Sequence, residues 1–349
     1  MREPSFWHRP SSWTSHLLRP FGALYGAVAA QRLRRKGFDA GIPVLCVGNY
    51  HVGGAGKTPT VLALADHLRR MGETPVVLSR GYGGKLSRPV MVDPARHSAA
   101  DVGDEPLMMA LRVPVVVSRD RVDGVALAKS KAASVILMDD GFQNPAVCKD
   151  ASLIVIDSER GLGNGRVFPA GPLRAPLPPQ LALTDALVVI GSGAAGQAVA
   201  AQITARGGPV FTARFEADAA SLAELKGRRV LAIAGIGDPA RFFRTLSGCG
   251  VDVVRSRTFA DHHRFSPSEI KGLLADAKSS GLALATTEKD FARLIGTSEA
   301  VRRDIVPFKV TLEFADVQNL RTFLADRLFW ARQKQFRSGA DCPMPQRLS

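Results

Sequence analysis

Residues 44–60, VLCVGNYHVGGAGKTPT, contain the residue types that bind the phosphates of a nucleotide. Gly56, Lys57 and Thr58 match the end of the pattern G-x-x-x-x-G-K-[ST], but His51 stands where that pattern has its first glycine. In such a loop the backbone N–H groups converge on the phosphates, the lysine reaches the β- and γ-phosphates, and the hydroxyl holds Mg²⁺. The stretch therefore predicts a nucleotide site, with a plain strand-to-helix turn as the alternative.

The segments on either side of this loop are those that a phosphate-binding loop requires. Residues 44–47 form a short apolar run, which is typical of a buried parallel strand. Residues 60–70 carry apolar side chains at helical spacing, so the loop opens a helix whose N-terminus attracts anions. The residues predicted to contact the nucleotide are Val52, Gly53, Gly54, Ala55, Gly56, Lys57, Thr58 and Pro59.

A pair of carboxylates ends a second apolar run, VILMDDGFQ. Asp139 and Asp140 follow the predicted strand 135–138, at the place where a Walker B acid would hold Mg²⁺ or its water. The predicted metal ligands are therefore Thr58, Asp139 and Asp140. The alternative is that two adjacent acids simply end a strand in solvent.

Three further motifs carry groups that fit phosphoryl transfer. DVGDEP contains Asp104, which either deprotonates an attacking hydroxyl group or caps the following helix. FADHHRF contains His262, which could hydrogen-bond to a carboxylate across a cleft between domains, and the motif lacks the ligand spacing of a zinc site. Arg174 in GPLRAP either clamps a phosphate oxygen or is a structural surface residue. TTEKD departs from the N-K-x-D of GTPases, which favours ATP.

Apolar runs alternate with helical patterns along the 349 residues, which indicates an α/β fold. We predict a P-loop-type parallel sheet flanked by helices, a second smaller α/β domain, and an N-terminal amphipathic helix. The predicted strands are 44–47, 76–78, 115–117, 135–138, 153–156 and 187–190 in the first domain, and 230–234, 251–254, 282–285 and 305–310 in the second. The predicted parts are an N-terminal segment 1–40, a nucleotide-binding domain 41–225, a smaller domain 226–312 that contributes to the cleft, and a C-terminal helix and tail 313–349.

The basic residues gather at the two ends of the chain. Of the net charge of +14, residues 1–40 carry +5 and residues 327–349 carry +4, which predicts contact with a membrane or a nucleic acid. The N-terminus favours the membrane, because apolar side chains at helical steps follow a capping serine, Ser11 or Ser12, and precede a basic cluster. These side chains are Trp13, Leu17, Phe21, Leu24, Tyr25 and Val28. The segment is too short to span a bilayer, and the alternative is a helix packed on the protein's own core.

Four cysteines, at 46, 148, 249 and 342, are scattered along the chain without C-x-x-C spacing. This distribution argues against a structural zinc site or a disulfide framework and fits a reducing compartment.

Taken together, the motifs resemble those of the tetraacyldisaccharide 4′-kinases, the lipid A 4′-kinases of Gram-negative bacteria. VGNYHVGGAGKTP, SRGYGG, DVGDEP, DDGFQ, FPAGPLR, FADHH and TTEKD occur in the family's order and cover most of the chain. The family's P-loop also lacks the first glycine. The resemblance implies two α/β domains with the active site between them, and transfer of the ATP γ-phosphoryl group to the 4′-hydroxyl of a lipid-linked disaccharide 1-phosphate.

The resemblance also assigns roles to residues. Lys57 and Thr58 would hold phosphate and Mg²⁺, Asp104 would be the base with His262 as its partner, and Arg174 would stabilise the transferred phosphate. The protein would lie on the cytoplasmic face of the inner membrane, bound to anionic lipid and not to nucleic acid. One departure is Ala175, which replaces a glutamate that the family links to Mg²⁺. A functional alternative is a P-loop ATPase that acts as a switch on a membrane or a nucleic acid.

Overall fold

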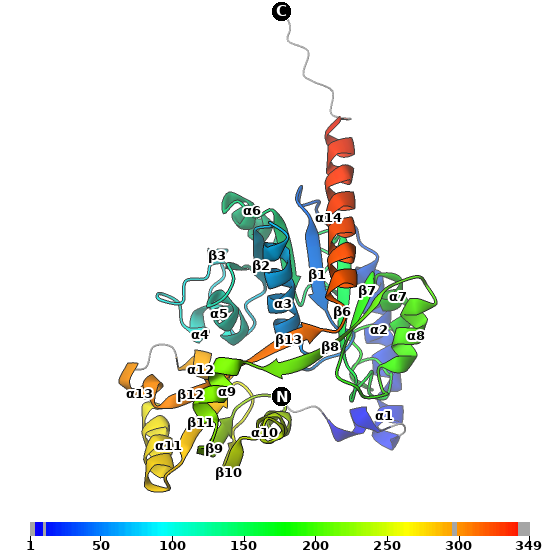
Figure 1. Ribbon diagram of the computed structural model, residues 1–349. Helices are drawn as coiled ribbons and strands as arrows, with labels where there is room; N and C mark the ends of the chain where they lie inside the picture. The colour runs from blue at the N-terminus through cyan, green and yellow to red at the C-terminus, as the bar shows by residue number, and fades with distance from the viewer. Residues whose placement is uncertain (1–3, 10–11, 295–298, 341–349) are drawn as a thin grey trace, which may run out of the picture.

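The computed structural model describes residues 4–9, 12–294 and 299–340, which form two lobes of unequal size (Figure 1). The larger lobe is built on a nine-stranded sheet of order β13-β8-β7-β6-β1-β5-β2-β4-β3. Its strands pair in parallel except at the two edges, where β13 and β3 run antiparallel to their neighbours. The predicted P-loop-type α/β fold is therefore confirmed.

The six strands predicted for the first domain begin and end close to the predicted positions, whereas β3, β8 and β13 were not predicted as strands of this sheet. The bounds of the strands in the large sheet are β1 Val44–Gly48, β2 Pro75–Ser79, β3 Val90–Met91, β4 Val115–Val117, β5 Val135–Asp139, β6 Ala151–Asp157, β7 Ala186–Ile190, β8 Val210–Ala217 and β13 Val310–Phe314. The central strands are buried along their whole length, because helices cover both faces of the sheet and leave no polar side to alternate with an apolar one.

Helices from distant parts of the chain cover each face of this sheet. One face packs against α3 (Lys57–Arg70), α5 (Asp104–Ala110) and α14 (Val317–Ala340), and α14 projects beyond the sheet in Figure 1. The other face packs against α6 (Arg121–Ser130), α7 (Leu177–Ala182) and α8 (Gln197–Thr204). The short α4 (Ala99–Val102) precedes α5.

The smaller lobe is a four-stranded parallel sheet of order β10-β9-β11-β12. Its strands are β9 Arg229–Ala234, β10 Asp252–Thr258, β11 Ala283–Thr287 and β12 Ile305–Phe308. Its helices are α9 Ala219–Leu225, α10 Pro239–Gly248, α11 Pro267–Ser279, α12 Glu288–Arg293 and α13 Glu299–Arg303. Leu225 and Phe242 pack on one face of the sheet, and Ile270 and Leu273 pack on the other.

The chain crosses between the lobes twice, which the sequence did not reveal. It leaves the large sheet after β8 and returns after β12, and β13 then pairs antiparallel with β8. The prediction of one strand over 305–310 is wrong, because Lys309 lies between β12 of the small sheet and β13 of the large one. The predicted boundary at 312 consequently falls inside β13. A mostly apolar run interrupted by one lysine does not show that its two halves join different sheets.

The N-terminal segment begins with the 3₁₀ helix η1 (Ser5–His8) and continues in α1 (Trp13–Leu17) and α2 (Arg19–Leu33). Ser12 caps α1 by accepting a hydrogen bond from the Ser15 N–H, as predicted, whereas Ser11 lies outside the described residues. Trp7 is buried and donates from Nε1 to the Pro169 carbonyl at 3.1 Å, so it belongs to the core.

The two helices α1 and α2 turn small residues toward the body of the protein and large apolar ones away from it. Ser15, Gly22 and Gly26 are buried. The six apolar side chains singled out in the sequence are exposed over 45–78% of their surface: Trp13, Leu17, Phe21, Leu24, Tyr25 and Val28. The alternative of an amphipathic helix that buries its apolar face in the protein's own core is therefore wrong. Among the described residues, none of the helices is both long enough and apolar enough to cross a bilayer.

Candidate active site

The predicted phosphate-binding loop lies where the strand order of the large sheet reverses. On one side of β1 the sheet continues through β5, β2, β4 and β3. On the other side it continues through β6, β7, β8 and β13. The crevice at the carboxyl end of β1 is the position at which open α/β sheets bind ligands. The loop there reaches α3 through Gly56, which adopts a left-handed φ of 88°. Helix α3 begins at Lys57, three residues before the predicted start, so its amides face the loop.

Gly56 has no room for a side chain. A Cβ at this position would lie 2.5 Å from Cδ1 of Ile190 and 3.2 Å from Cζ of Phe215. Because strain and overpacking add, we expect Gly56→Ala to lower the free energy of unfolding by about 1–3 kcal/mol, measured by chemical denaturation without nucleotide. Gly54→Ala is the matched control, because the described residues leave the space around its Cβ open to 4 Å. Equal stability of the two variants would contradict the steric account.

A cavity of about 700 Å³ lies between the P-loop and the smaller lobe. All eight residues predicted to contact nucleotide line it, from Val52 to Pro59. The opposite wall comes from the smaller lobe and includes Ile236, Asp238, Arg241, Phe242, Asp261 and Lys289. A nucleotide in the P-loop would therefore be enclosed by both lobes, and its exposure to water would depend on how closely they approach.

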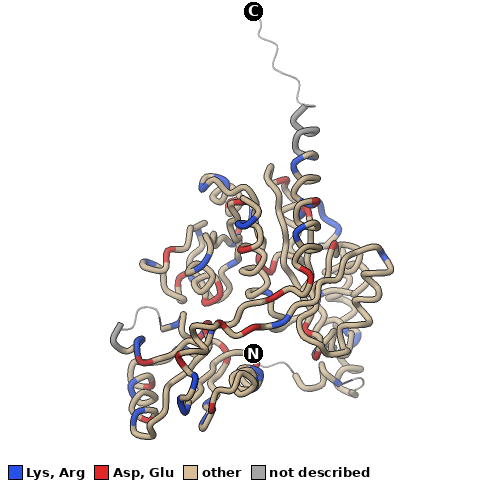
Figure 2. Tube along the Cα trace, viewed as in Figure 1, with Lys and Arg blue, Asp and Glu red and all other residues tan. Residues whose placement is uncertain are grey.

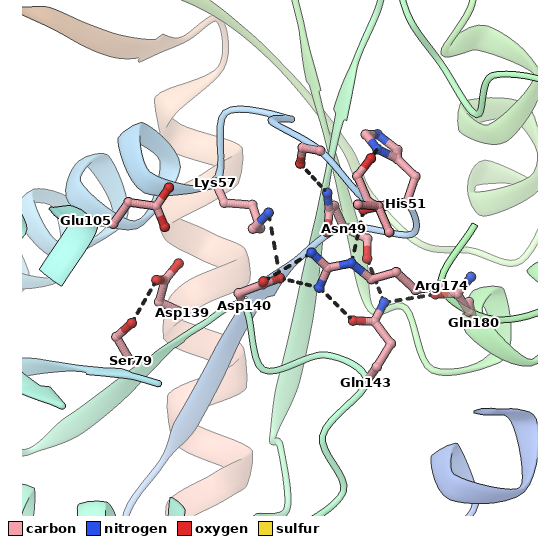
Figure 3. A network of polar contacts seen from close by, with 12 residues as sticks. Asn49, His51, Lys57, Ser79, Glu105, Asp139, Asp140, Gln143, Arg174 and Gln180 are labelled. Carbon is pink, nitrogen blue, oxygen red and sulfur yellow. Dashed lines mark hydrogen bonds and ion pairs between the residues drawn. The ribbon is translucent and has the colours of Figure 1, made fainter. Parts of the chain in front are cut away.

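Asp140 is the centre of a polar network at the end of β5 (Figure 3). Arg174 binds its carboxylate through two nitrogens, at 2.8 and 3.1 Å, and Lys57 Nζ lies 3.6 Å from Oδ1. Nε of Arg174 also donates to the His51 carbonyl at 3.1 Å. Burial raises the pKa of Asp140, but the charges of Lys57 and Arg174 outweigh it, so the pKa is lowered and the carboxylate stays charged.

Asp139 is buried beside Asp140 and has the opposite electrostatics. Its burial and the nearby carboxylates of Glu105 and Asp140 raise its pKa to about 7, and Ser79 Oγ donates to it at 3.2 Å. Figure 3 shows Asp139 and Glu105 with Lys57 close to both. Excess negative charge of this kind is a place where a cation would bind favourably.

The residues at the end of β5 fit a Mg²⁺ ion that arrives with a nucleotide, rather than a metal held by protein alone. Among the described residues no three His, Cys, Asp or Glu side chains form a metal-binding group. Mg²⁺ commonly uses one or two carboxylates and completes its shell with water and phosphate oxygens. Ala175 is fully buried and contributes only its carbonyl, which accepts from Gln180 Nε2 at 2.7 Å.

Asp104 and His262, predicted as base and partner, meet across the boundary between the lobes. Asp104 is the first residue of α5 in the larger lobe, and His262 follows β10 in the smaller one. His262 Nδ1 lies 2.7 Å from Oδ2 of Asp104. Burial raises the pKa of Asp104, but the hydrogen bond from His262 and the charge of Arg293 outweigh it, so the pKa lies below its ordinary value.

The sequence did not predict the ion pairs that several charged residues form at this boundary. Lys289 Nζ lies 3.1 Å from Oε1 of Glu105, next to the pair just described. At another place along the boundary, Arg160 binds Asp238 at 2.6 Å and Arg241 pairs with the buried Asp157. Acidic and basic positions both follow the boundary between the lobes in Figure 2. In the sequence, the motif TTEKD bears only on the question of guanine recognition. In the structure, its Lys289 forms a contact between the lobes.

Comparison with known proteins gives a consistent result. A family profile described as Tetraacyldisaccharide-1-P 4'-kinase matches residues 14–329. A protein of Bradyrhizobium diazoefficiens named tetraacyldisaccharide 4'-kinase is 68% identical over 336 residues, which cover 96% of this chain and 99% of that protein. A protein of the same name from Rhodopseudomonas palustris is 65% identical over 332 residues, which cover 95% of this chain and 98% of that one.

The fold matches a solved structure over nearly its whole length. The crystal structure of LpxK from Aquifex aeolicus in complex with ATP superimposes with a TM-score of 0.71 at 28% identity, and covers 90% of this chain and 99% of that one. The sequence resemblance, the profile and the fold thus agree along most of the chain. The chain belongs to the tetraacyldisaccharide-1-phosphate 4'-kinase family.

Proposed function

We propose that this protein transfers the γ-phosphoryl group of ATP to the 4′-hydroxyl of a tetraacyldisaccharide 1-phosphate, a step of lipid A biosynthesis. Family membership supplies the class of acceptor. The observation that carries the chemistry is the hydrogen bond from His262 to Asp104, beside a cavity lined by the P-loop. A nucleotide-binding loop and a carboxylate oriented by histidine are what a kinase needs to transfer phosphate to an alcohol.

Asp104 takes the proton of the attacking hydroxyl group. Two donors, His262 and Arg293, both bond to Oδ2 of Asp104, so within the described part of the chain Oδ1 remains for the sugar hydroxyl. The sugar oxygen forms a bond to the γ-phosphorus while the bond from that phosphorus to the bridging oxygen of ADP breaks. The hydroxyl proton passes to Asp104, whose lowered pKa keeps it ionised at neutral pH.

Thr58, Asp139 and Asp140 are the residues that would hold Mg²⁺, which would offset the charge that develops on the phosphates. Glu105 lines the cavity, and although burial raises its pKa, the charges of Lys289 and Lys57 outweigh burial and lower it, so we assign to this carboxylate the acidic position left open by Ala175. Arg174 is bound to Asp140, which supports a role in fixing that carboxylate. Its contact with the transferred phosphate stays a prediction.

The test is incubation of the purified protein with γ-labelled ATP and a tetraacyldisaccharide 1-phosphate, with the label followed on the lipid. We expect label on the lipid, and only at the 4′ position. The competing function, an ATPase switch, gives free labelled phosphate instead, with hydrolysis that increases on addition of vesicles or DNA. Hydrolysis without a labelled lipid would overturn the kinase proposal.

We also propose that α1 and α2 bind the anionic cytoplasmic face of the inner membrane without spanning it. The six exposed apolar side chains support this, together with the exposed basic residues Arg32, Arg34, Arg35 and Lys36 that follow them. Apolar side chains beside basic ones are the arrangement of a helix that lies in a membrane interface. The acceptor lipid is presented at that surface, so binding there would bring the cavity and the substrate together.

Replacing Phe21 and Leu24 with serine should weaken binding to anionic vesicles about tenfold or more. Each side chain would withdraw from lipid, and full burial of such a side chain contributes about 1.5–3 kcal/mol. Vesicle flotation measures the change. Point substitutions are preferable to removal of the segment, because Trp7 and Ser15 pack on the body of the protein. The control is Leu111→Ser, which changes a side chain of similar exposure in the larger lobe; equal loss in both variants would contradict the proposal.

A further inference from the structure

Arg293 is a buried arginine that bonds directly to Asp104 and is linked to His262 through a shared backbone carbonyl. Its side chain is 3% exposed, and its Nε donates to Oδ2 of Asp104 at 2.8 Å. Its Nη1 donates to the Gly235 carbonyl at 2.8 Å. The same carbonyl accepts from the backbone N–H of His262 at 3.1 Å. One guanidinium group therefore joins the carboxylate of one lobe to the turn that carries the histidine of the other.

Asp290 holds this guanidinium group in place. It is fully buried and forms an ion pair with Nη1 of Arg293. Its Oδ2 also accepts from the Gly235 N–H at 2.9 Å and from Thr287 Oγ1 at 2.7 Å. The Asp290 carboxylate is thus fixed by groups on β11, α12 and the turn after β9. Arginine suits the position because its planar fork donates in several fixed directions, which an ammonium group does not.

The conformation of His262 makes such support necessary. Its φ of 61° lies in the left-handed region, which is rarely adopted by residues other than glycine. The side chain is partly exposed, and its imidazole nitrogens lie 2.7 Å from Oδ2 of Asp104 and 3.8 Å from Oδ2 of Asp261. The bond from its N–H to the Gly235 carbonyl is therefore an important restraint on the direction of the imidazole ring.

We propose that Arg293 is a positioning residue for phosphoryl transfer, which aligns Asp104 with His262 when the two lobes meet and is itself oriented by Asp290. The inference rests on the proposed kinase function and adds to it a coupling between lobe closure and alignment of the base. When the lobes separate, Arg293 leaves with the smaller lobe, and Asp104 loses both donors to its Oδ2 together. The base is then aligned only in the closed form, which limits misdirected transfer to water.

The test compares Arg293→Gln and Arg293→Lys with the unaltered protein in the lipid-labelling assay. We expect kcat to fall about 100-fold in the glutamine variant, since a misplacement of about 1 Å at the reacting groups costs that much, while KM for ATP changes little. The lysine variant should recover part of kcat, because it keeps the charge but not the fork. Arg255→Gln is the control, since Arg255 forms an exposed pair with Asp276 in the same lobe.

A double-mutant cycle separates positioning from a loss of stability. Because Arg293 acts through Asp104, the double variant Asp104→Ala/Arg293→Gln should have a kcat no lower than that of Asp104→Ala alone. The positioning role would be overturned if the two losses in kcat multiply in the double variant, or if Arg293→Gln has the kcat of the unaltered protein. Neither result would contradict the kinase function. If the glutamine variant does not fold, the lysine variant enters the same cycle. Absence of labelled lipid with the unaltered protein would overturn the kinase function itself, and the positioning role with it.

Discussion

Lys57→Ala should reduce phosphoryl transfer by roughly 10²–10³-fold. Lys57 is the first residue of α3 and its amine is mostly shielded from water, 3.6 Å from Asp140. Removing it takes away a fixed positive charge at the place where the β- and γ-phosphates would lie, and loss of one such preorganised group costs roughly 10²–10³-fold. Without the ammonium group, the negative charges of Asp140, Asp139 and Glu105 are also less well neutralised.

The measurement is label transfer from ATP to the lipid disaccharide, with thermal unfolding recorded for the same preparation. Lys278→Ala removes an equally charged but exposed side chain at the end of α11 and should leave turnover unchanged. The fold of the Lys57 variant should persist, because the core beneath α3 consists of Val61, Leu64 and Leu68 and is not touched. Turnover within a few-fold of the unaltered protein would refute the assignment of this loop as the phosphate site.

Asp104→Asn should keep nucleotide binding and lose about 10²–10⁴-fold in kcat. Asparagine has nearly the same shape but does not accept a proton, and general base catalysis contributes about that factor. Asp104 lies on α5 and is not one of the P-loop residues that line the cavity, so KM for ATP should change little. Steady-state kinetics with both substrates, and titration with a fluorescent ATP analogue, separate the two effects.

Asp326→Asn is the matched control, since Asp326 is an exposed carboxylate on α14. The pKa of Asp104 is lowered in the folded protein, so its ionised form stabilises the fold above the ordinary aspartate pKa, and this stabilisation is lost as the pH falls through the lowered value. The variant should therefore be somewhat less stable than the unaltered protein at pH 7. Near-normal turnover would exclude Asp104 as the base, and loss of nucleotide binding would reassign it to the nucleotide site.

Local sequence was sufficient to predict the strand, the glycine-rich loop and the helix start within residues 44–60. Residues 44–60 contain a strand, a glycine-rich turn and a helix start that follow one another directly, so their relation in space is set by short-range geometry. The same holds for Asp139 and Asp140, because a carboxylate after a buried parallel strand lies at the same edge of the sheet as the neighbouring loop. The resemblance to the kinase family, read from such motifs, is confirmed.

The contacts between lobes were much harder to predict. Asp104 and His262 were paired only through the family resemblance, since 158 residues separate them and neither motif indicates its partner. Arg293 had no signal of its own, because a charged residue on a helical face is usually solvated and nothing in its neighbours marks it as buried. The return of the chain at Lys309 was also missed, since both strands around it are apolar.

By itself, the sequence determined the α/β class and the kinase family, from patterns and motifs along most of the chain. It also determined the glycine-rich loop after β1 and the place of the carboxylates at the end of β5, because each of these depends on spacing within one short segment. Only the tertiary structure decided which way the N-terminal helices face. Their apolar positions predict an amphipathic helix whether the apolar side faces the core or the solvent. Burial of Gly22 and Gly26 against the body of the protein is what turns Phe21 and Leu24 outward. The tertiary structure also decided that Arg293 joins Asp104 to the turn of His262, because hydrogen bonds between lobes form only when distant segments are brought together.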